Sequence, residues 1–175
     1  MKRKERPNRV LFVVDYENII ISFKESIDPA KFSIEAGFQR VIENITGQIG
    51  EIAGIFAFLP PDRAMVWGAE LHKLGFNIIL CPRIKDKEDE ELDTTDSRMI
   101  ELGEWLVENT KGLTHLCVGS GDADFSGLIM KAKLKGLKIA VVAADIRSLS
   151  AKVIELTDKD PLTGKKMVFL FSPTE

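Results

Sequence analysis

The sequence predicts an α/β fold in which one central, mainly parallel sheet is flanked by helices on both faces. Apolar runs of strand length alternate along the chain with amphipathic segments of helix length, which is the pattern of repeated βα units. Two of the joints resemble each other, because Gly75 and Gly136 each stand between a helical pattern and an apolar run. Glycine can adopt the left-handed conformation that ends a helix and releases the chain into a strand.

Each predicted element rests on a local pattern. The fifth predicted helix, for example, carries Leu128, Ile129 and Ala132 at helical spacing, which gives it one inward face. The strands are short apolar runs: VLFVV at 10–14, IAGIFAF at 52–58, FNIIL at 76–80, THLCV at 114–118, KIAVVA at 138–143 and MVFLF at 167–171. Between them, helices are predicted over residues 17–26, 33–46, 63–74, 95–108, 125–135 and 148–156.

Length and composition favour one domain. The chain has 175 residues, of which 45% are hydrophobic and 29% charged, which is enough for one substantial core. We expect residues 9–175 to form this domain and residues 1–8 to form a basic arm. The arm's charges could contact nucleic acid or only aid solubility. Its basic residues are Lys2, Arg3, Lys4 and Arg6.

The pattern of charges also limits where the protein acts. Charged residues interrupt every apolar run well before the roughly 20 residues that a spanning helix needs. Asp15 and Glu17 break the first apolar run, which argues against a signal peptide. Cys81 and Cys117 are far apart in the sequence and are expected to be reduced core thiols. We therefore expect a cytoplasmic protein that does not enter a membrane.

Acidic residues gather in three clusters beside predicted strand or helix boundaries. Two of the clusters follow strands, and the carboxyl ends of parallel strands are where open sheets bind ligands. Carboxylates gathered there would repel one another, and a hard divalent cation would resolve the conflict. In the third cluster, Gly121 is expected to allow a sharp turn. The clusters are Asp15-Tyr16-Glu17-Asn18, Asp93-Thr94-Thr95-Asp96 and Ser120-Gly121-Asp122-Ala123-Asp124-Phe125.

Most of these residues also have a purely structural interpretation. Asn18 could cap the helix that follows Asp15, and Asp124 could cap the helix that follows the third cluster. Asp96 could simply complement the dipole of its helix. Asp122 has no comparable structural role in the sequence. The combination of clusters therefore carries more weight than any one of them.

Four segments carry a resemblance to a known family. They are Val-Val-Asp-Tyr-Glu-Asn at 13–18, Asp-Ser-Arg-Met-Ile-Glu-Leu-Gly at 96–103, residues 113–125 and residues 136–142. In this order and spacing, from about Arg9 to Leu156, the chain resembles the NYN-domain family, a branch of the PIN-like metal-dependent nucleases. The resemblance implies a sheet in the order 3-2-1-4-5 and hydrolysis of RNA phosphodiesters with Mg²⁺ or Mn²⁺. A homodimer is a further expectation by analogy with the family.

Carried over to this sequence, the resemblance assigns a catalytic site. Asp15, Asp96 and Asp122 look like the metal-binding carboxylates, and Asn18 and Asp124 complete the site. Asp93 remains an alternative to Asp96 because the alignment could slip by one helical turn. The attacking group would be a water activated by the metal. Candidates for binding the substrate, expected to be single-stranded RNA, are Tyr16 by stacking, Ser120, and the cations Arg63, Arg83, Lys85 and Arg98.

Other functions compete with the nuclease hypothesis. A non-catalytic RNA-binding or protein-interaction module could keep the fold, although the complete set of acids argues against lost chemistry. A phosphatase with an aspartyl nucleophile would want a second acid two residues after Asp15, and Glu17 is a poor substitute. The charged segment from Arg83 to Asp93 is expected to form a mobile loop. Trp67 and Trp105 are expected to be helix residues of the core.

Overall fold

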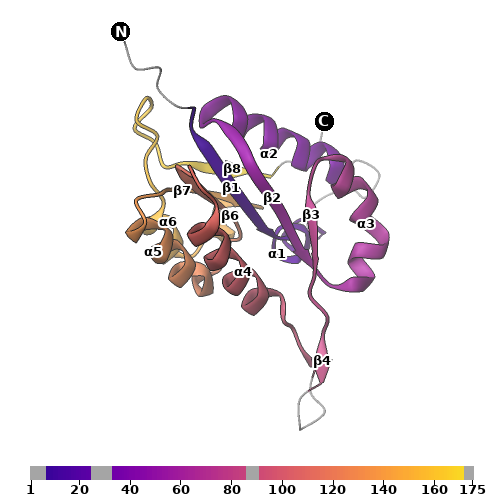
Figure 1. Cartoon of the computed structure of the whole chain (residues 1–175). Helices are drawn as coiled ribbons and strands as arrows, with labels where there is room; N and C mark the ends of the chain where they lie inside the picture. Colours follow the sequence, from indigo (N-terminus) through magenta and orange to yellow (C-terminus); the bar gives the residue numbers. More distant parts are fainter. Residues whose placement is uncertain (1–6, 25–32, 86–90, 172–175) are drawn as a thin grey trace.

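The computed structural model describes residues 7–24, 33–85 and 91–171, apart from the side chains of residues 22–24. A sheet runs through the middle of the molecule with helices on both faces, which confirms the predicted α/β fold (Figure 1). The basic residues at positions 2, 3, 4 and 6 of the predicted arm lie outside the described residues. The same is true of residues 86–90 in the predicted charged loop.

Six strands form the central sheet in the order β3-β2-β1-β6-β7-β8, and every neighbouring pair is parallel. Counted without the β4-β5 hairpin, this order contains the implied arrangement 3-2-1-4-5 and extends it by β8. The inner strands β1 and β6 are almost completely buried, which explains their continuous apolar sequences. The strands are β1 (Arg9–Asp15), β2 (Glu51–Leu59), β3 (Asn77–Leu80), β6 (His115–Gly119), β7 (Lys138–Ala143) and β8 (Val168–Leu170).

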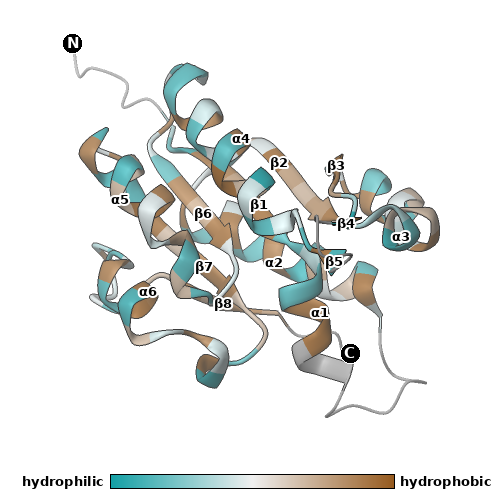
Figure 2. Cartoon of the chain, turned by 90° about the horizontal axis from the view of Figure 1, so that it is seen from below, coloured by the Kyte–Doolittle hydropathy of each residue, from teal (hydrophilic) through white to brown (hydrophobic). Residues whose placement is uncertain are grey.

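Two hydrophobic clusters lie on opposite faces of the sheet. Alternate residues of β1 point to different faces, so Phe12 belongs to one cluster and Val13 to the other. Helices α1 (Tyr16–Lys24), α2 (Ile34–Gln48) and α3 (Pro61–Lys73) contribute to the first cluster. Helices α4 (Thr95–Asn109), α5 (Ser126–Leu134) and α6 (Ala151–Leu156) contribute to the second. The strands are accordingly mostly hydrophobic, whereas the helices carry hydrophilic outer positions (Figure 2).

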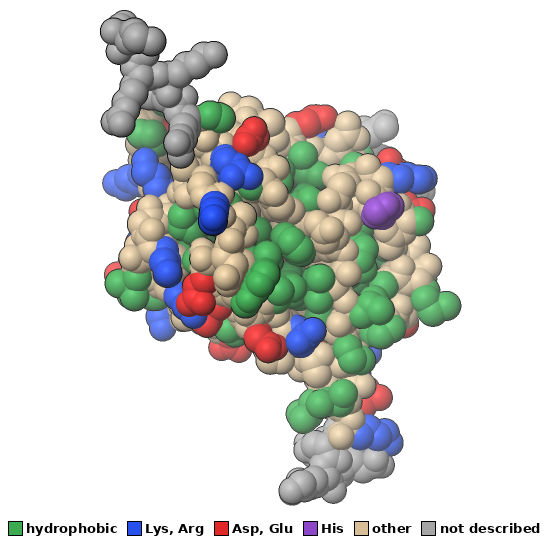
Figure 3. Space-filling model, in the orientation of Figure 1, with side chains coloured by type: hydrophobic (Ala, Val, Ile, Leu, Met, Phe, Trp, Pro, Cys, Tyr) green, Lys and Arg blue, Asp and Glu red, His purple; other side chains and the backbone are tan. Residues whose placement is uncertain are grey.

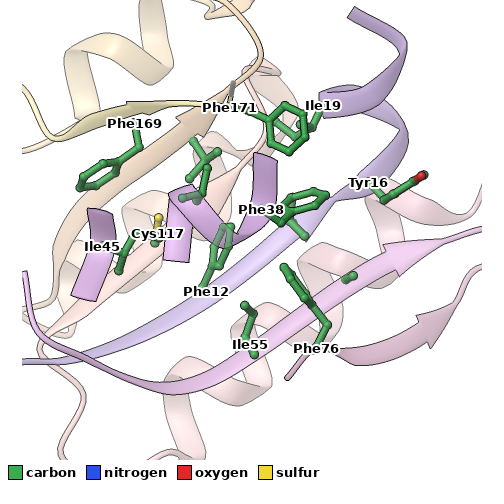
Figure 4. Close-up of a cluster of buried hydrophobic side chains, with 14 of the residues drawn as sticks. Phe12, Tyr16, Ile19, Phe38, Ile45, Ile55, Phe76, Cys117, Phe169 and Phe171 are labelled. Atoms are coloured by element: carbon green, nitrogen blue, oxygen red, sulfur yellow. The ribbon is translucent and has the colours of Figure 1, made fainter. Parts of the chain in front are cut away.

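Aromatic rings organise the first cluster (Figure 4). The ring centroid of Phe38 on α2 lies 4.8 Å from that of Phe171 and 5.2 Å from that of Phe76. Phe76 in turn lies 6.0 Å from Phe12 on β1. These rings connect the central strand, a helix and the last described residue of the chain. They anchor the end of β1, from which the first acidic cluster emerges.

Several local predictions can be compared with the structure. Gly75 and Gly136 have φ values of 90° and 82°, so both adopt the predicted left-handed conformation. Cys81 and Cys117 are free and buried, as expected. Within the helices of the described residues, none combines the length and apolar character of a membrane-spanning segment. On the face shown in Figure 3, hydrophobic side chains gather in the middle and acidic ones below them.

The charged segment from Arg83 to Asp93, expected to form a mobile loop, has strand structure in its described residues. Its described ends form a short antiparallel pair, β4 (Ile84–Lys85) with β5 (Glu91–Leu92). Ile84 of β4 lies opposite Leu92 of β5, and such apolar cross-strand pairs stabilise a hairpin. The charged composition of the segment gives no sign of this pair. The hairpin projects beyond the sheet next to β3 (Figure 1).

Candidate metal centre

The first and third acidic clusters meet because their strands are neighbours. Val14 of β1 pairs with Gly119 of β6 in parallel register, so both strands end at the same edge of the sheet. Asp15 is the last residue of β1, and Asp122 follows β6 by three residues. Helix α4, which begins at Thr95, packs on this part of the sheet and brings the second cluster to the same edge. The topology therefore gathers acids from three separate parts of the chain.

Three carboxylates converge into one trio. Asp96, Asp122 and Asp124 can each place an oxygen within 4.8 Å of the others. Asp96 is partly buried, whereas Asp122 and Asp124 are exposed. Burial and the charges of Asp122 and Asp124 raise the pKa of Asp96 above its ordinary value. The trio is thus a concentration of negative charge that is energetically costly in the absence of a cation.

Asp122 has a structural role that the sequence did not reveal. Its carboxylate accepts a hydrogen bond of 3.0 Å from the backbone N of Asp124 and caps the short 3₁₀ helix η2 (Ala123–Phe125). The structural alternative of a cap, considered for Asp124, therefore applies to Asp122. The cap fixes the orientation of Asp122 and leaves the Asp124 side chain in the trio.

Asp15 lies beside the trio and is not a member of it. Asp15 is only 7% exposed, and its Oδ1 accepts a 3.1 Å hydrogen bond from the backbone N of Asn18. Burial, followed by the charges of Asp96, Asp93 and Glu17, raises the pKa of Asp15 to about 7, although the Asn18 hydrogen bond opposes this. A buried carboxylate with such a pKa needs a nearby positive charge in order to ionise fully at neutral pH.

Asp93 and Asp96 have different positions in the structure. Asp93 uses its Oδ1 to accept a 2.8 Å hydrogen bond from the backbone N of Thr95 at the start of α4. Asp96 is the residue of this pair that joins the trio. The arrangement therefore favours Asp96 as the ligand, with Asp93 as a nearby charge that stabilises the helix start.

The turn after β6 is held by close packing. A Cβ atom on Gly121 would lie 2.1 Å from the carbonyl oxygen of Ser148, so the position excludes any larger residue. Gly121 is not among the glycines with positive φ, so this close approach, and not a left-handed backbone, is what requires glycine here. Its backbone N donates a long hydrogen bond of 3.4 Å to Oδ1 of Asn18. Ser120 is buried and accepts 3.2 Å from the backbone N of Asp122, so it supports the turn.

The donor set of this edge fits a hard divalent cation. The three carboxylates place oxygens within 4.8 Å of one another, and carboxylate oxygens are the ligands that hard divalent cations prefer. Of the ion pairs formed by the described residues, none neutralises Asp15 or a member of the trio. Carboxylates that lack a protein cation and repel one another are suited to a metal ion.

Two of the predicted substrate-binding cations lie together at the next strand ends. Arg63, in the first turn of α3, donates through Nε to Oε1 of Glu17 at 3.2 Å. Arg83, three residues after β3, donates through Nη2 to Oε2 of the same carboxylate at 3.2 Å. The sequence analysis missed this role of Glu17. In the sequence Glu17, two residues after Asp15, looks like one more acid of the cluster, and only the tertiary structure shows that it contacts Arg63 and Arg83.

The other residues predicted to bind the substrate are less well placed for that role. The ring of Tyr16 is 1% exposed and lies 6.4 Å from Phe38, so it packs in the core and is not available to stack on a base. Arg98 forms an exposed pair with Glu101 on α4. Lys85 lies in the exposed hairpin. Trp105, predicted to be buried, is 57% exposed on the outer face of α4.

Comparisons with known structures support the fold. A protein of unknown function from Vibrio parahaemolyticus superposes with a TM-score of 0.71 at 18% identity, over 96% of this chain and 94% of that one. MurG from Acinetobacter baumannii gives 0.47 at 11% identity, over 96% of this chain and 47% of that one. A nicotinamidase from Staphylococcus aureus gives 0.39 at 17% identity, over 83% and 86%. The last two are too distant to carry an argument.

The sequence comparison identifies the family. A search of curated proteins finds no match to the chain. The profile of the NYN domain matches residues 9–160, from the start of β1 to beyond α6. This match includes all of the acids that meet at the carboxyl edge of the sheet. The parallel sheet, the acidic trio and the extent of the match lead to one conclusion: the chain belongs to the NYN domain family, within the PIN-like nuclease superfamily.

Proposed function

We propose that this protein is a metal-dependent ribonuclease that hydrolyses phosphodiester bonds of single-stranded RNA. The observation that carries the proposal is the trio of Asp96, Asp122 and Asp124 at the carboxyl edge of an NYN fold. NYN domains are generally nucleases, and the trio gives this chain an acidic cluster suited to a divalent metal.

The acids have distinct roles in this proposal. Asp96, Asp122 and Asp124 would hold Mg²⁺ or Mn²⁺, with Asp15 as a further ligand or a neighbouring charge. When bound, the cation would polarise the scissile phosphate and lower the pKa of a water. The backbone hydrogen bonds to Asp15 and Asp122 orient these two carboxylates before any metal binds. Asn18 connects the turns after β1 and β6 without adding negative charge.

Metal-dependent cleavage is the first expected result. Purified protein should cut a labelled, unstructured RNA in the presence of Mn²⁺ or Mg²⁺, and EDTA should stop the reaction. The measurement is product formation on a denaturing gel. Cleavage that persists in EDTA would contradict the proposal, and so would intact RNA in the presence of either metal. Intact RNA together with metal binding would favour a non-catalytic module on this fold.

Metal binding should also stabilise the fold. A ligand present at about 100 times its Kd adds about 2.7 kcal/mol to the free energy of unfolding, because it binds only the folded state. For a chain of this size, we expect the Tm to rise by roughly 5–10 °C. Differential scanning fluorimetry with Mn²⁺, and with a monovalent salt at equal ionic strength, measures this. Asp96→Asn should reduce the rise, and an equal rise in that variant would exclude the trio as the binding site.

A further inference from the structure

Two arginines near the carboxyl ends of β2 and β3 are held by a single carboxylate. Oε1 and Oε2 of Glu17 each accept one arginine, at 3.2 Å from Arg63 Nε and 3.2 Å from Arg83 Nη2. The Glu17 side chain is 12% exposed, whereas those of Arg63 and Arg83 are 37% and 43% exposed. Glu17 is therefore the buried centre of the arrangement, and the two guanidinium groups extend from it toward solvent.

The three residues come from adjacent strand ends. Asp15 of β1 pairs with Phe58 of β2, and Leu59 of β2 pairs with Leu80 of β3. Glu17, Arg63 and Arg83 follow these three strands in the same order. Adjacent strands are about 4.8 Å apart, so the arginines lie about one or two strand spacings from Asp15 along the edge. Asp122 and Asp124 of the trio follow β6, on the opposite side of Asp15, and Asp96 lies in the first turn of α4.

The guanidinium groups keep unused hydrogen-bonding capacity. A guanidinium carries five N–H donors, and the contacts with Glu17 use one nitrogen of each arginine. Arg63 has one further, longer approach to Asp62, at 3.8 Å through the same Nε. Glu17 and the more distant Asp62 balance the charges of the two arginines, so what the cluster offers a phosphate is a set of unused N–H donors held in place by one largely buried carboxylate. A planar group with free donors in a fork is well suited to a phosphate.

Glu17 also keeps the arginines away from the metal ligands. Arg63 is paired with Glu17 and Asp62, and Arg83 is paired with Glu17, at distances of 3.2–3.8 Å. The arginines are thus not arranged to neutralise Asp15. An arginine paired with that carboxylate would compete with a metal ion for it. Glu17 occupies the arginines instead and leaves Asp15 and the trio to the cation.

We infer that Glu17, Arg63 and Arg83 form a binding site for an RNA phosphate next to the scissile one, with Glu17 as the positioning residue. The inference rests on the proposed function, because the trio must hold the scissile phosphate. The RNA backbone would run along the carboxyl edge of the sheet, from the trio past Asp15 to the ends of β2 and β3. Arg63 and Arg83 would contact the backbone and carry no sequence specificity.

The two explanations of Glu17 predict effects of opposite sign. If the arginines acted only as diffuse positive charge, Glu17→Gln would remove a negative charge and tighten RNA binding. If Glu17 positions the guanidinium groups, the same change should weaken binding several-fold. Glu51→Gln is the matched control: Glu51 pairs with Arg9 Nε at the same 3.2 Å, at the opposite ends of the strands. It changes the charge equally without affecting the proposed site.

The test is binding of a fluorescein-labelled oligouridylate by fluorescence anisotropy, with Mn²⁺ present and Asp122→Asn as the common background to prevent cleavage. Arg63→Ala and Arg83→Ala should each weaken binding about tenfold, as expected for losing a charged hydrogen bond. Each should also lower the slope of log affinity against log salt by about 0.7, the value for one phosphate of a single strand. Arg9→Ala should change neither quantity to this extent.

The inference is overturned if Glu17→Gln binds as tightly as Glu51→Gln, if the arginine variants match Arg9→Ala, or if the background binds no RNA. Arg63→Lys and Arg83→Lys keep the charge and should still weaken binding, which separates geometry from charge and covers any alanine variant that fails to fold. If RNA binding depends on the arginines but the wild type cleaves no RNA, the nuclease proposal alone is wrong. If the wild type cleaves RNA but the arginine variants bind it normally, the proposed phosphate site alone is wrong.

Discussion

Asp122→Asn is expected to abolish RNA cleavage while the protein stays folded. Asparagine is also a good capping residue, so it can keep the hydrogen bond from the backbone N of Asp124. The substitution therefore removes one negative charge from the trio and leaves the cap in place. Loss of a residue that merely supports a metal ligand already costs 10–100-fold, so loss of a ligand itself should lower the cleavage rate by about 100-fold or more. Single-turnover cleavage with saturating Mn²⁺ measures this rate.

The metal-free stability of the same variant tests the electrostatic argument independently. Asp122 is the first of the charges that raise the pKa of Asp96, so its removal relieves repulsion within the trio. The Tm in EDTA should therefore equal or exceed that of the wild type. A variant that has lost both activity and stability would show that the cap matters more than the charge, which is the opposite of our assignment.

Asp145→Asn provides the matched control for this variant. Asp145 follows the neighbouring strand β7 and caps the 3₁₀ helix η3 (Ile146–Ser148) in the same way, accepting 2.8 Å from the backbone N of Arg147. Its carboxylate is paired with the Arg147 side chain at 2.8 Å and takes no part in the trio. Cleavage should remain within about twofold of the wild type. If Asp122→Asn and Asp145→Asn both abolish cleavage, the loss cannot be assigned to the trio.

The fold was largely predictable because its inner strands β1, β6 and β7 are almost completely buried. Such strands form continuous apolar runs, and all six runs became strands of the sheet. The hairpin formed by β4 and β5 was missed for the complementary reason. Its pairing depends on Ile84 and Leu92, two apolar residues in a segment dominated by charge. Local composition indicates burial, whereas a short exposed pair depends on which residues face each other.

The site was less predictable because its details depend on tertiary contacts. The sequence indicated that acids would meet at one edge, and Asp96, Asp122 and Asp124 do meet. It could not show that Asp122 would be the cap, since Asp124 two residues later has the same chemistry. It also could not show that Tyr16, next to a site residue, would turn into the core against Phe38. Side-chain direction at a strand end is decided by packing.

The pH dependence of stability should reveal Asp15. Its pKa rises from 3.8 in the unfolded chain to about 7 in the folded protein. Between these values the folded state binds more protons than the unfolded state, so stability is lost as the pH rises. At about 1.4 kcal/mol per pKa unit, the loss reaches roughly 4 kcal/mol by pH 8. Urea unfolding of the metal-free protein between pH 5 and 8 should show roughly 3 kcal/mol of this decline, because only the interval from pH 5 to the pKa of about 7 contributes.

Asp15→Asn should flatten that decline, because asparagine keeps an oxygen for the backbone N of Asn18 and has no charge to desolvate. Asp158→Asn is the control of opposite sign. Asp158 pairs with Lys133 at 2.8 Å, and its pKa lies below the ordinary value, so its stabilising effect is lost only toward acid pH. If Asp15→Asn shows the same decline as the wild type, another group causes it.

Mn²⁺ should offset the wild-type decline by favouring ionised carboxylates, since metal binding requires deprotonated ligands. A wild-type decline that Mn²⁺ leaves unchanged would place Asp15 outside the metal's influence and leave the trio as the whole of the binding site.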